Sequence, residues 1–413
     1  MVGNWPFFPL SELTINYDAR RVPIKEADRR LGLYPYYGAS GIVDYVNDYI
    51  FDGEYLLIAE DGENLRTRQT PVAFMASGRF WVNNHAHVVT GNGNASTRFI
   101  NYALQCTDIS SYLTGAVMPK LTQSNLNRIE IPVPSQIIQN RIVDILGVLD
   151  DKIKLNRQVA KTLEAMAQAL FKSWFVDFGP VRAKAEGRPA KLPDGVAVLF
   201  PDQLGKDGLP EGWNAATLLD FFDLEGGGTP KTSVADYWDG DVPWFSVVDT
   251  PVSGIYVHDT KRMLTQAGLA NCAATLLPEN ATIVTARGTV GKIALVGRPM
   301  AINQSCYAAI AKDNYGPFFI YFLIQSSLEA LRTQTHGSVF DTITRSTFAS
   351  VSTNRPPHAL AAIYEAAVTP LLGKMKVVAE QSRALATLRD TLLPKLIFGE
   401  LRIRDAEQTV VAA

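Results

Sequence analysis

An internal repeat is the feature that most constrains how this chain can fold. The segment PKLTQSNLNRIEIPVP precedes one long helical pattern, and FDTITRSTFASVSTNRPP precedes another. Leu163 is equivalent to Leu385 and Pro134 to Pro356, and both differences, 385 minus 163 and 356 minus 134, are 222. Each copy is long enough to be a domain plus a helix, which excludes a solenoid of short repeats. The sequence therefore predicts one architecture used twice.

The repeat also sets the expected domain boundaries. Short β-like runs such as YLLIAEDG and ATIVTARGTVGKIALV alternate with turn signals, so both globular parts are expected to be mixed α/β (α+β) domains. The segment between the copies is rich in Pro and Gly and is predicted to be a linker. The predicted order is domain 1–135, long helix 136–178, linker 179–212, domain 213–356, long helix 357–398 and tail 399–413.

Two long helices are expected to separate the domains. Apolar residues recur at spacings of three and four in both helical stretches, and each helix of about 40 residues would be roughly 60 Å long. The simplest partner for each is the other, as an antiparallel pair; the alternative is two amphipathic helices that pack separately on their own domains. Pro370 is expected to kink the second helix and Gly399 to end it. The predicted helix-contact positions are Leu163, Leu170, Trp174, Leu385, Leu392 and Leu396.

Composition limits the possible partners and compartments. The formal net charge is −2, with 39 Lys and Arg against 41 Asp and Glu, which argues against a chain that binds nucleic acid through phosphates alone. No apolar run is long enough for a membrane span, and the N-terminus lacks the pattern of a secretion signal. The three cysteines have no CxxC pairing. We expect a cytoplasmic protein without a membrane partner.

Several motifs, taken in order, resemble the specificity subunits of type I restriction-modification enzymes. They are YYGASGIVDYVNDYIFDGEYLLIAEDG in the first domain, GGGTPKTSVADYWDGDVPWFS, ARGTVGKIAL and INQSCYA in the second, and LEAMAQALFKSWFVDF and LATLRDTLLPKLIFGEL in the helices. The resemblance covers nearly the whole chain. It implies two pseudo-symmetric target-recognition domains, each reading one half of a split double-stranded DNA sequence.

The resemblance also implies partners. The helices would dock two methyltransferase (modification) subunits and recruit restriction/translocase subunits. S-adenosylmethionine, and ATP with magnesium, would be cofactors of those partners, and this chain would have none. If the methyltransferases supply most phosphate contacts, a specificity chain of near-neutral charge is expected, because base contacts specify whereas phosphate contacts position.

Candidate DNA contacts lie on loops that combine Gly, a cation and small hydrogen-bonding residues, because base edges need donors on a backbone that approaches closely. The alternative for each is a solvated turn, and aromatic residues beside Gly are also typical of packing at strand ends. The predicted contacts are Lys120, Thr122, Gln123, Asn125, Tyr37, Ser40, Thr229, Lys231, Thr232, Arg287, Thr289, Lys292, Ser338, Thr342, Thr344 and Arg345, with Tyr36, Asn303 and Gln304 as further possibilities.

Catalytic and metal motifs are not recognisable in the sequence. His85 and His87 lie two apart in a predicted strand without a matching set of ligands, so we expect surface or DNA-facing side chains and no metal. GTVGK does not satisfy the phosphate-binding loop pattern, and no adenine-methylation or Ser/His/Asp pattern stands out. A non-catalytic DNA reader is the leading hypothesis. The alternatives are an enzyme with an unrecognised site and an orphan scaffold that docks partners without reading DNA.

Overall fold

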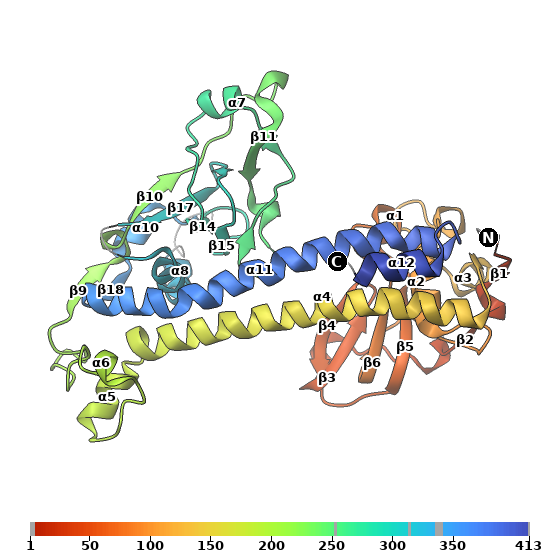
Figure 1. Ribbon diagram of the computed structural model, residues 1–413, viewed down its shortest axis with the longest axis horizontal. Helices are drawn as coiled ribbons and strands as arrows, with labels where there is room; N and C mark the ends of the chain where they lie inside the picture. The colour runs from red at the N-terminus through yellow and green to blue at the C-terminus, as the bar shows by residue number, and fades with distance from the viewer. Residues whose placement is uncertain (1–4, 252–253, 313–314, 335–341, 412–413) are drawn as a thin grey trace. The chain divides into compact units, whose positions relative to one another are not determined.

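The computed structural model describes residues 5–251, 254–312, 315–334 and 342–411 (Figure 1). The chain divides into two compact units. The first unit comprises Met1–Lys154 and Arg383–Ala413, and the second comprises Leu155–Ser382. Each unit contains one globular head and a part of both long helices, α4 (Gln136–Phe171) and α11 (His358–Ile397).

The first head is built on a mixed sheet with the strand order β2-β7-β5-β6-β3-β4. The pairing of β3 with β6 is parallel, and the other pairings are antiparallel. A separate antiparallel pair joins β1 to β8. The strands are β1 (Phe7–Pro9), β2 (Thr14–Asn16), β3 (Leu31–Gly38), β4 (Gly41–Val46), β5 (Phe51–Ala59), β6 (Ala73–Val82), β7 (Ala86–Gly91) and β8 (Glu130–Pro132), and the helices are α1 (Asn64–Thr67), α2 (Thr97–Cys106) and α3 (Gln123–Arg128).

Both faces of this sheet are buried, which explains the apolar runs in its central strands. Leu56 and Ile58 of β5 join the core beneath α2, whereas Leu57 joins an aromatic cluster on the opposite face with Phe51 and Phe80. Successive side chains of a strand point to opposite faces. A strand covered on both sides therefore needs a continuous apolar run and not an alternating one.

The second head repeats this plan with shorter strands. One sheet has the order β10-β17-β14-β15-β12, a second has β13-β11-β16, and β9 pairs with β18. Its strands are β9 (Asn214–Thr217), β10 (Phe222–Gly226), β11 (Trp238–Phe245), β12 (Tyr256–Val257), β13 (Met263–Leu264), β14 (Thr282–Thr285), β15 (Ile293–Val296), β16 (Ala301–Ile302), β17 (Cys306–Ala311) and β18 (Ser352–Arg355), and its helices are α7 (Gln266–Ala270), α8 (Pro317–Ser326), α9 (Leu328–Thr333) and α10 (Arg345–Ser350).

Strand pairing confirms that the heads are two copies of one fold. Ile58 of β5 lies opposite Ala73 of β6, and Val284 of β14 lies opposite Ile293 of β15 in the same antiparallel arrangement. The long strand β6 of the first head corresponds to β15 and β16 together, since β6 pairs in parallel with β3 as β16 does with β11. The mixed α/β fold class is thus as predicted.

The long helices pack against each other within each unit. In the second unit, the Asn156 side chain donates a hydrogen bond to Gln381 (3.0 Å), and Tyr364 donates to the Ala167 carbonyl (3.0 Å). Residues further along α4 thus meet residues further back along α11, which defines an antiparallel pair. In the first unit, Arg389 donates to Asp150 across the same pair of helices (2.7 Å). The alternative of helices that pack separately is therefore wrong.

The helix ends differ in detail from the expectation. After α4, the chain makes a π-helical turn (Lys172–Val176), so Trp174 lies in this turn and not in the α-helix. Pro370 does not interrupt α11. Gly399 follows the end of α11 with φ +70° and donates its N–H to the Leu396 carbonyl, which confirms its predicted role in ending the helix.

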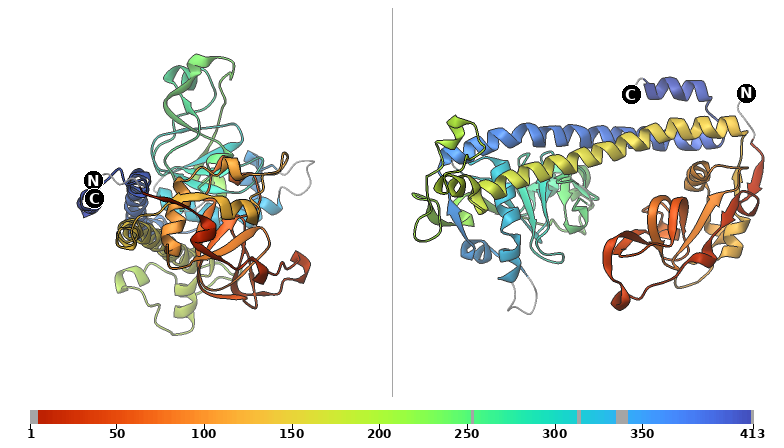
Figure 2. Two further views of the ribbon diagram at one scale, coloured as in Figure 1. Left: turned by 90° about the vertical axis from the view of Figure 1, so that its right-hand side faces the viewer. Right: turned by 90° about the horizontal axis from the view of Figure 1, so that it is seen from below.

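Three further helices follow the ends of the long ones. The linker contains α5 (Gly179–Ala185) and α6 (Asp194–Ala197). The C-terminal helix α12 (Ile403–Val411) buries Ala406 in the core of the first unit, and Figure 2 shows it beside the long helices. Among the described helices, none combines the length and the apolar character that a membrane crossing requires.

Candidate nucleic-acid interface

Three loops with predicted contact residues, and the turn that contains Asn303 and Gln304, meet at one edge of the second head. The backbone N–H groups of Ala286 and Arg287 donate to the Ser305 carbonyl (2.8 and 3.3 Å), and the N–H of Ile343 donates to the Ala286 carbonyl (3.0 Å). The Thr229 hydroxyl donates to the side-chain oxygen of Gln304. The structure thereby brings together the segments around Thr229, Arg287, Gln304 and Thr344.

The first head joins its loops through the same backbone hydrogen bonds. The N–H of Glu60 donates to the His85 carbonyl (2.9 Å), and the N–H of Leu121 donates to the Glu60 carbonyl (2.8 Å). These two bonds reproduce those of Ala286 and Ile343 in the second head. The loop after β5, the turn between β6 and β7 and the segment before α3 therefore lie together.

The turn between β6 and β7 and its equivalent between β16 and β17 are also held by matching hydrogen bonds. The N–H of Asn83 donates to the Tyr37 carbonyl (3.0 Å), and the Asn83 side chain accepts from the N–H of His85 (2.8 Å). Asn303 makes the matching bonds to Phe245 (2.9 Å) and Ser305 (3.0 Å). We call this shared arrangement the loop frame: Glu60–Asp61, Asn83–His85 and Lys120–Thr122 in the first head, and Ala286–Arg287, Asn303–Ser305 and Thr342–Thr344 in the second.

Two predicted contact residues serve the frame as helix caps. The Thr122 hydroxyl accepts from the N–H of Asn125 (3.3 Å) at the start of α3, and the Thr344 hydroxyl accepts from the N–H of Thr347 (3.3 Å) at the start of α10. A threonine N-cap satisfies one of the helix's unpaired donors. The equivalent caps explain why these two threonines recur 222 residues apart.

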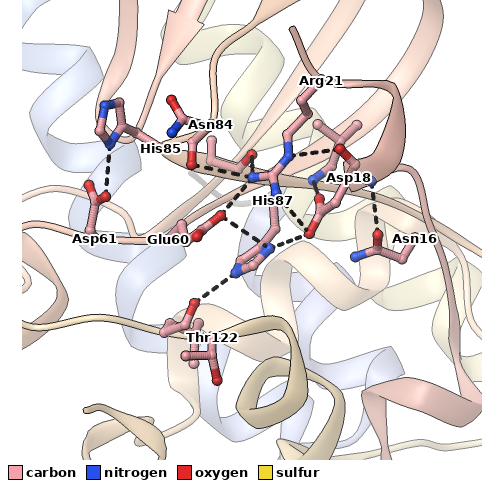
Figure 3. Close-up of polar contacts among 12 residues, drawn as sticks. Asn16, Asp18, Arg21, Glu60, Asp61, Asn84, His85, His87 and Thr122 are labelled. Atoms are coloured by element: carbon pink, nitrogen blue, oxygen red, sulfur yellow. Dashed lines mark hydrogen bonds and ion pairs between the residues drawn. The ribbon is translucent and has the colours of Figure 1, made fainter. Parts of the chain in front are cut away.

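A buried polar cluster lies between the segments of the first frame (Figure 3). His87, only 1% exposed, places Nδ1 2.5 Å from the Asp18 carboxylate and Nε2 2.8 Å from the Leu121 carbonyl. Arg21 donates to Glu60 (2.7 Å) and to the Ala86 carbonyl (2.8 Å). The cluster ties the Lys120–Thr122 segment to β7 and to the turn that contains Asp18.

Opposing effects act on the pKa of Asp18. Burial raises it, but the hydrogen bond and charge of His87, the N–H of Val88 and the charge of Arg21 together bring the pKa of Asp18 below its ordinary value. Both His87 ring nitrogens face oxygen atoms inside the head. The expectation that His87 is on the surface or faces DNA is therefore wrong. Its neighbour His85 is 52% exposed and contacts Asp61 (2.8 Å).

The remaining predicted residues occupy different environments. Those exposed on loops or helix starts are Ser40, Lys120, Gln123, Thr229, Lys231, Thr232, Arg287, Thr289, Lys292, Thr344 and Arg345, and Thr342 is half-buried. Lys120 contacts Glu60 (3.3 Å), and Arg345 donates to the Leu224 carbonyl (3.3 Å). Asn125 donates to the Tyr112 carbonyl (2.8 Å). Ser338 lies outside the described residues.

Both aromatic candidates pack within the first head. Tyr36 is 1% exposed and accepts a hydrogen bond from the N–H of Ile24 (2.9 Å). Tyr37 packs against Phe74 and Phe80. Burial raises the pKa of Tyr37. The alternative that the sequence left open, packing at a strand end, describes both residues.

The helix-contact positions lie in the apolar cores of their own units. Leu385, Leu392 and Leu396 are buried in the first unit, and Trp174 in the second. Leu163 and Leu170 are partly buried against the core of the second unit.

Sequence reasoning missed five residues of the first frame, Glu60, Asp61, Asn83, Asn84 and Leu121, and named His85 only as a surface or DNA-facing side chain. The signal was present in the repeat, since Asn83 precedes Asn303 by 220 residues, the same offset that relates the FINYALQ and FIYFLIQ segments. Among the described residues, no group of three or more His, Cys, Asp or Glu side chains is placed to hold a metal ion.

Comparisons with known proteins match both copies of the repeat. The type I restriction modification DNA specificity domain matches residues 3–165 and 210–359. The type I restriction enzyme HindI specificity subunit of Haemophilus influenzae is 28% identical over 328 residues, which are 68% of this chain and 71% of that protein. The MjaIX specificity subunit of Methanocaldococcus jannaschii is 25% identical over 395 residues, 91% of this chain and 88% of that protein.

A solved structure has the same fold. The S subunit of a type I restriction-modification system from M. genitalium aligns over 95% of this chain and 96% of its own, with a TM-score of 0.58 and 13% identity. At this identity the likeness concerns the fold. The family assignment follows from the sequence match, which covers well over half of the chain and falls on both heads. The chain therefore belongs to the family of type I restriction-modification DNA specificity domains.

Proposed function

We propose that this chain reads a two-part DNA sequence for a type I restriction-modification complex, with one part read by each head. The observation that carries this proposal is the loop frame, which is built by the same hydrogen bonds in both heads but presents different side chains. A shared frame gives two readers of one geometry, and different side chains give them different base preferences.

The chain acts in this proposal without catalysis of its own. Methyltransferase subunits supply the chemistry with S-adenosylmethionine, and restriction/translocase subunits use ATP with magnesium. The names of the relatives, type I restriction enzyme specificity subunits, support this division of labour. A net charge of −2 also supports it, because phosphate contacts then come mainly from the partners.

The repeat supports docking of two methyltransferase subunits. Each unit contains one head and a stretch of antiparallel α4 and α11, so each offers an equivalent surface to an identical partner. Two binding sites of the same kind on one chain predict a stoichiometry of two methyltransferases to one specificity subunit. Native mass spectrometry of the co-expressed complex measures this ratio directly.

Co-expression with the methyltransferase of the same system tests the reading function. We expect no methylation by the isolated chain and sequence-specific adenine methylation by the complex, mapped by single-molecule sequencing. Exchange of residues 1–135 for the head of another specificity subunit should change one half of the methylated sequence and leave the other half intact. A change in both halves contradicts the model of two independent readers.

An orphan scaffold is the alternative to a DNA reader. Substitution of Lys120, Lys231 and Arg287 by Ala distinguishes the two, because all three cations are exposed on loops. A reader loses affinity or selectivity for its methylated sites, whereas a pure scaffold methylates the same sites as before. Lys206→Ala, an exposed charge in the linker, provides the control for loss of a cation outside the heads and the long helices.

A further inference from the structure

The loop frame offers one position in each head where the backbone is the same and the charge is opposite. Asp61 follows Glu60 in the first head, and Arg287 follows Ala286 in the second; Glu60 and Ala286 make the matched frame hydrogen bonds. A glycine with positive φ comes next in both, Gly62 at +111° and Gly288 at +79°. The backbone hydrogen bonds and the following glycine therefore determine the shape of this turn. The side chain at Asp61 or Arg287 can differ without changing that shape.

The environment of Asp61 favours a role in recognition over one in folding. Its side chain is 25% exposed and contacts Nδ1 of His85 (2.8 Å), which is itself 52% exposed. A partly exposed carboxylate–imidazole contact of this kind contributes little to stability. The contact does restrict the carboxylate to one orientation while leaving part of it accessible to a ligand.

The chemistry of DNA limits what this carboxylate can bind. An anion is repelled by phosphates, so Asp61 is not suited to a backbone contact. In the major groove, cytosine presents only its N4 amino donor, whereas adenine presents a donor beside the N7 acceptor, which repels a carboxylate. A carboxylate therefore selects cytosine. Arg287, with two parallel donors, selects the O6 and N7 acceptors of guanine.

We propose that Asp61, oriented by His85, is a specificity-determining residue of the first head and accepts a hydrogen bond from the N4 amino group of a cytosine in the first half-site. Arg287 occupies the matching position of the second head and reads a guanine. This assignment rests on the proposed function and adds to it the base that each position selects.

Asp61→Asn tests the assignment with an almost isosteric change. The amide has both an acceptor and a donor and so pairs bidentately with adenine. In the co-expressed complex, we expect discrimination for cytosine at one position of the first half-site to fall about tenfold, with a shift toward adenine. The second half-site stays unchanged. Glu54→Gln is the matched control, since Glu54 forms an exposed ion pair with Arg98 in the same head.

His85→Ala is the second variant, because a half-exposed side chain can be removed with little effect on folding. It should reduce discrimination between bases at the same position as Asp61→Asn, to a smaller extent. The assignment is overturned if the wild-type first half-site contains no G·C pair, if Asp61→Asn leaves the methylated sequence unchanged or abolishes methylation altogether, or if His85→Ala relaxes no position.

The two proposals fail differently in these experiments. If exchange of residues 1–135 alters the first half-site while Asp61→Asn does not, the chain is a reader and only the role of Asp61 is wrong. If the exchange alters nothing, the reading function itself is wrong.

Discussion

Nδ1 of His87 lies 2.5 Å from Oδ2 of Asp18, and both side chains are nearly inaccessible to solvent, at 1% and 7% exposure. The other ring nitrogen of His87 contacts the Leu121 carbonyl at 2.8 Å. One buried residue thus connects the sheet of the first head to the segment that carries Lys120 and Thr122. The position of the Lys120–Thr122 segment, a candidate recognition loop, therefore depends on the buried contacts of His87.

His87→Phe should loosen this loop. The aromatic ring fills the space but leaves the Asp18 carboxylate and the Leu121 carbonyl without their partner, and breaking such a buried pair destabilises by about 3 kcal/mol. Hydrogen exchange of the full chain should show faster exchange in residues 114–125. His85→Phe, at an exposed position two residues away, should change stability by less than about 0.5 kcal/mol. Equal effects of the two substitutions would contradict an anchoring role for His87.

The lowered pKa of Asp18 predicts how this cluster responds to acid. Because the folded state lowers the pKa of Asp18, the carboxylate stabilises the fold at pH values above its ordinary pKa of about 4, and this contribution is lost as pH falls further. Thermal melts from pH 3 to 7 should show Asp18→Asn less stable than wild type at pH 7. The difference between the two proteins should shrink below pH 4; a difference that grows there has the wrong sign for this mechanism.

Asp150 connects the first head to both long helices. It accepts hydrogen bonds from the Tyr102 hydroxyl of α2 (2.6 Å) and from Arg389 of α11 (2.7 Å). Burial, followed by the bond to Asp150, raises the pKa of Tyr102, so the phenol remains a donor at neutral pH. Asp150→Ala removes the acceptor for both donors and should destabilise the first unit by about 2 kcal/mol, with faster amide exchange in α2. Asp151→Ala, at the exposed next position, is the control and should have little effect.

The repeat made the two-head architecture predictable, because identical spacing of Leu163, Leu385, Pro134 and Pro356 reports a shared fold without requiring any strand to be recognised. The antiparallel helix pair followed from the length of the apolar stripes. The runs YLLIAEDG and ATIVTARGTVGKIALV contain the end of β5 and the whole of β14 and β15. The bounds and pairing of the strands did not follow, because a sheet buried on both faces lacks the alternating pattern that marks where a strand begins and which face it buries.

Residues of the loop frame were harder to predict. Asp61 and Arg287 are 226 residues apart, Asn83 and Asn303 are 220, and Leu121 and Ile343 are 222, so no single offset relates the frames. The shared prediction of a surface position for His85 and His87 was wrong for His87, for a local reason. Residues two apart in one strand share a face, but β7 begins at Ala86, so His85 belongs to the preceding turn and not to the strand. Only the hydrogen bonds reveal that one histidine is exposed and the other supports the loop.

Glu365 of α11 predicts a pH dependence of opposite sign in the second unit. Its carboxylate accepts from the N–H groups of Phe318 (3.2 Å) and Phe319 (2.8 Å) at the start of α8. Burial raises the pKa of Glu365 despite these two donors. The folded state therefore holds a proton that the unfolded state releases. Stability falls as pH rises from the ordinary pKa of a glutamate toward the raised pKa of Glu365, and it stays lower above that pKa.

Glu365→Gln should remove this part of the pH dependence. Relative to the variant, wild type should lose stability in thermal melts of the full chain as pH rises above about 4.3, the ordinary pKa of a glutamate. Glu380→Gln, at an exposed carboxyl on the same helix, should not reproduce the change. Gln139 supports the choice of glutamine, since it accepts from the N–H of Ser96 (3.3 Å) at the start of the equivalent helix α2. A wild-type advantage that increases with pH would refute the assignment.

Neighbouring glycines in the second head give a test that needs no charge change. A Cβ on Gly227 would lie 2.0 Å from the Asn303 carbonyl oxygen, whereas one on Gly226 would meet nothing within 4 Å. Gly227→Ala must push the 226–232 loop away from the Asn303–Ser305 turn and break the contact between Thr229 and Gln304. If this edge reads DNA, Gly227→Ala should reduce methylation at least tenfold or relax the second half-site while leaving the first half-site intact, because backbone displacement misplaces every contact on the loop. Gly226→Ala should retain wild-type methylation. Identical behaviour of the two variants would show that the close approach of Gly227 to Asn303 does not matter for recognition.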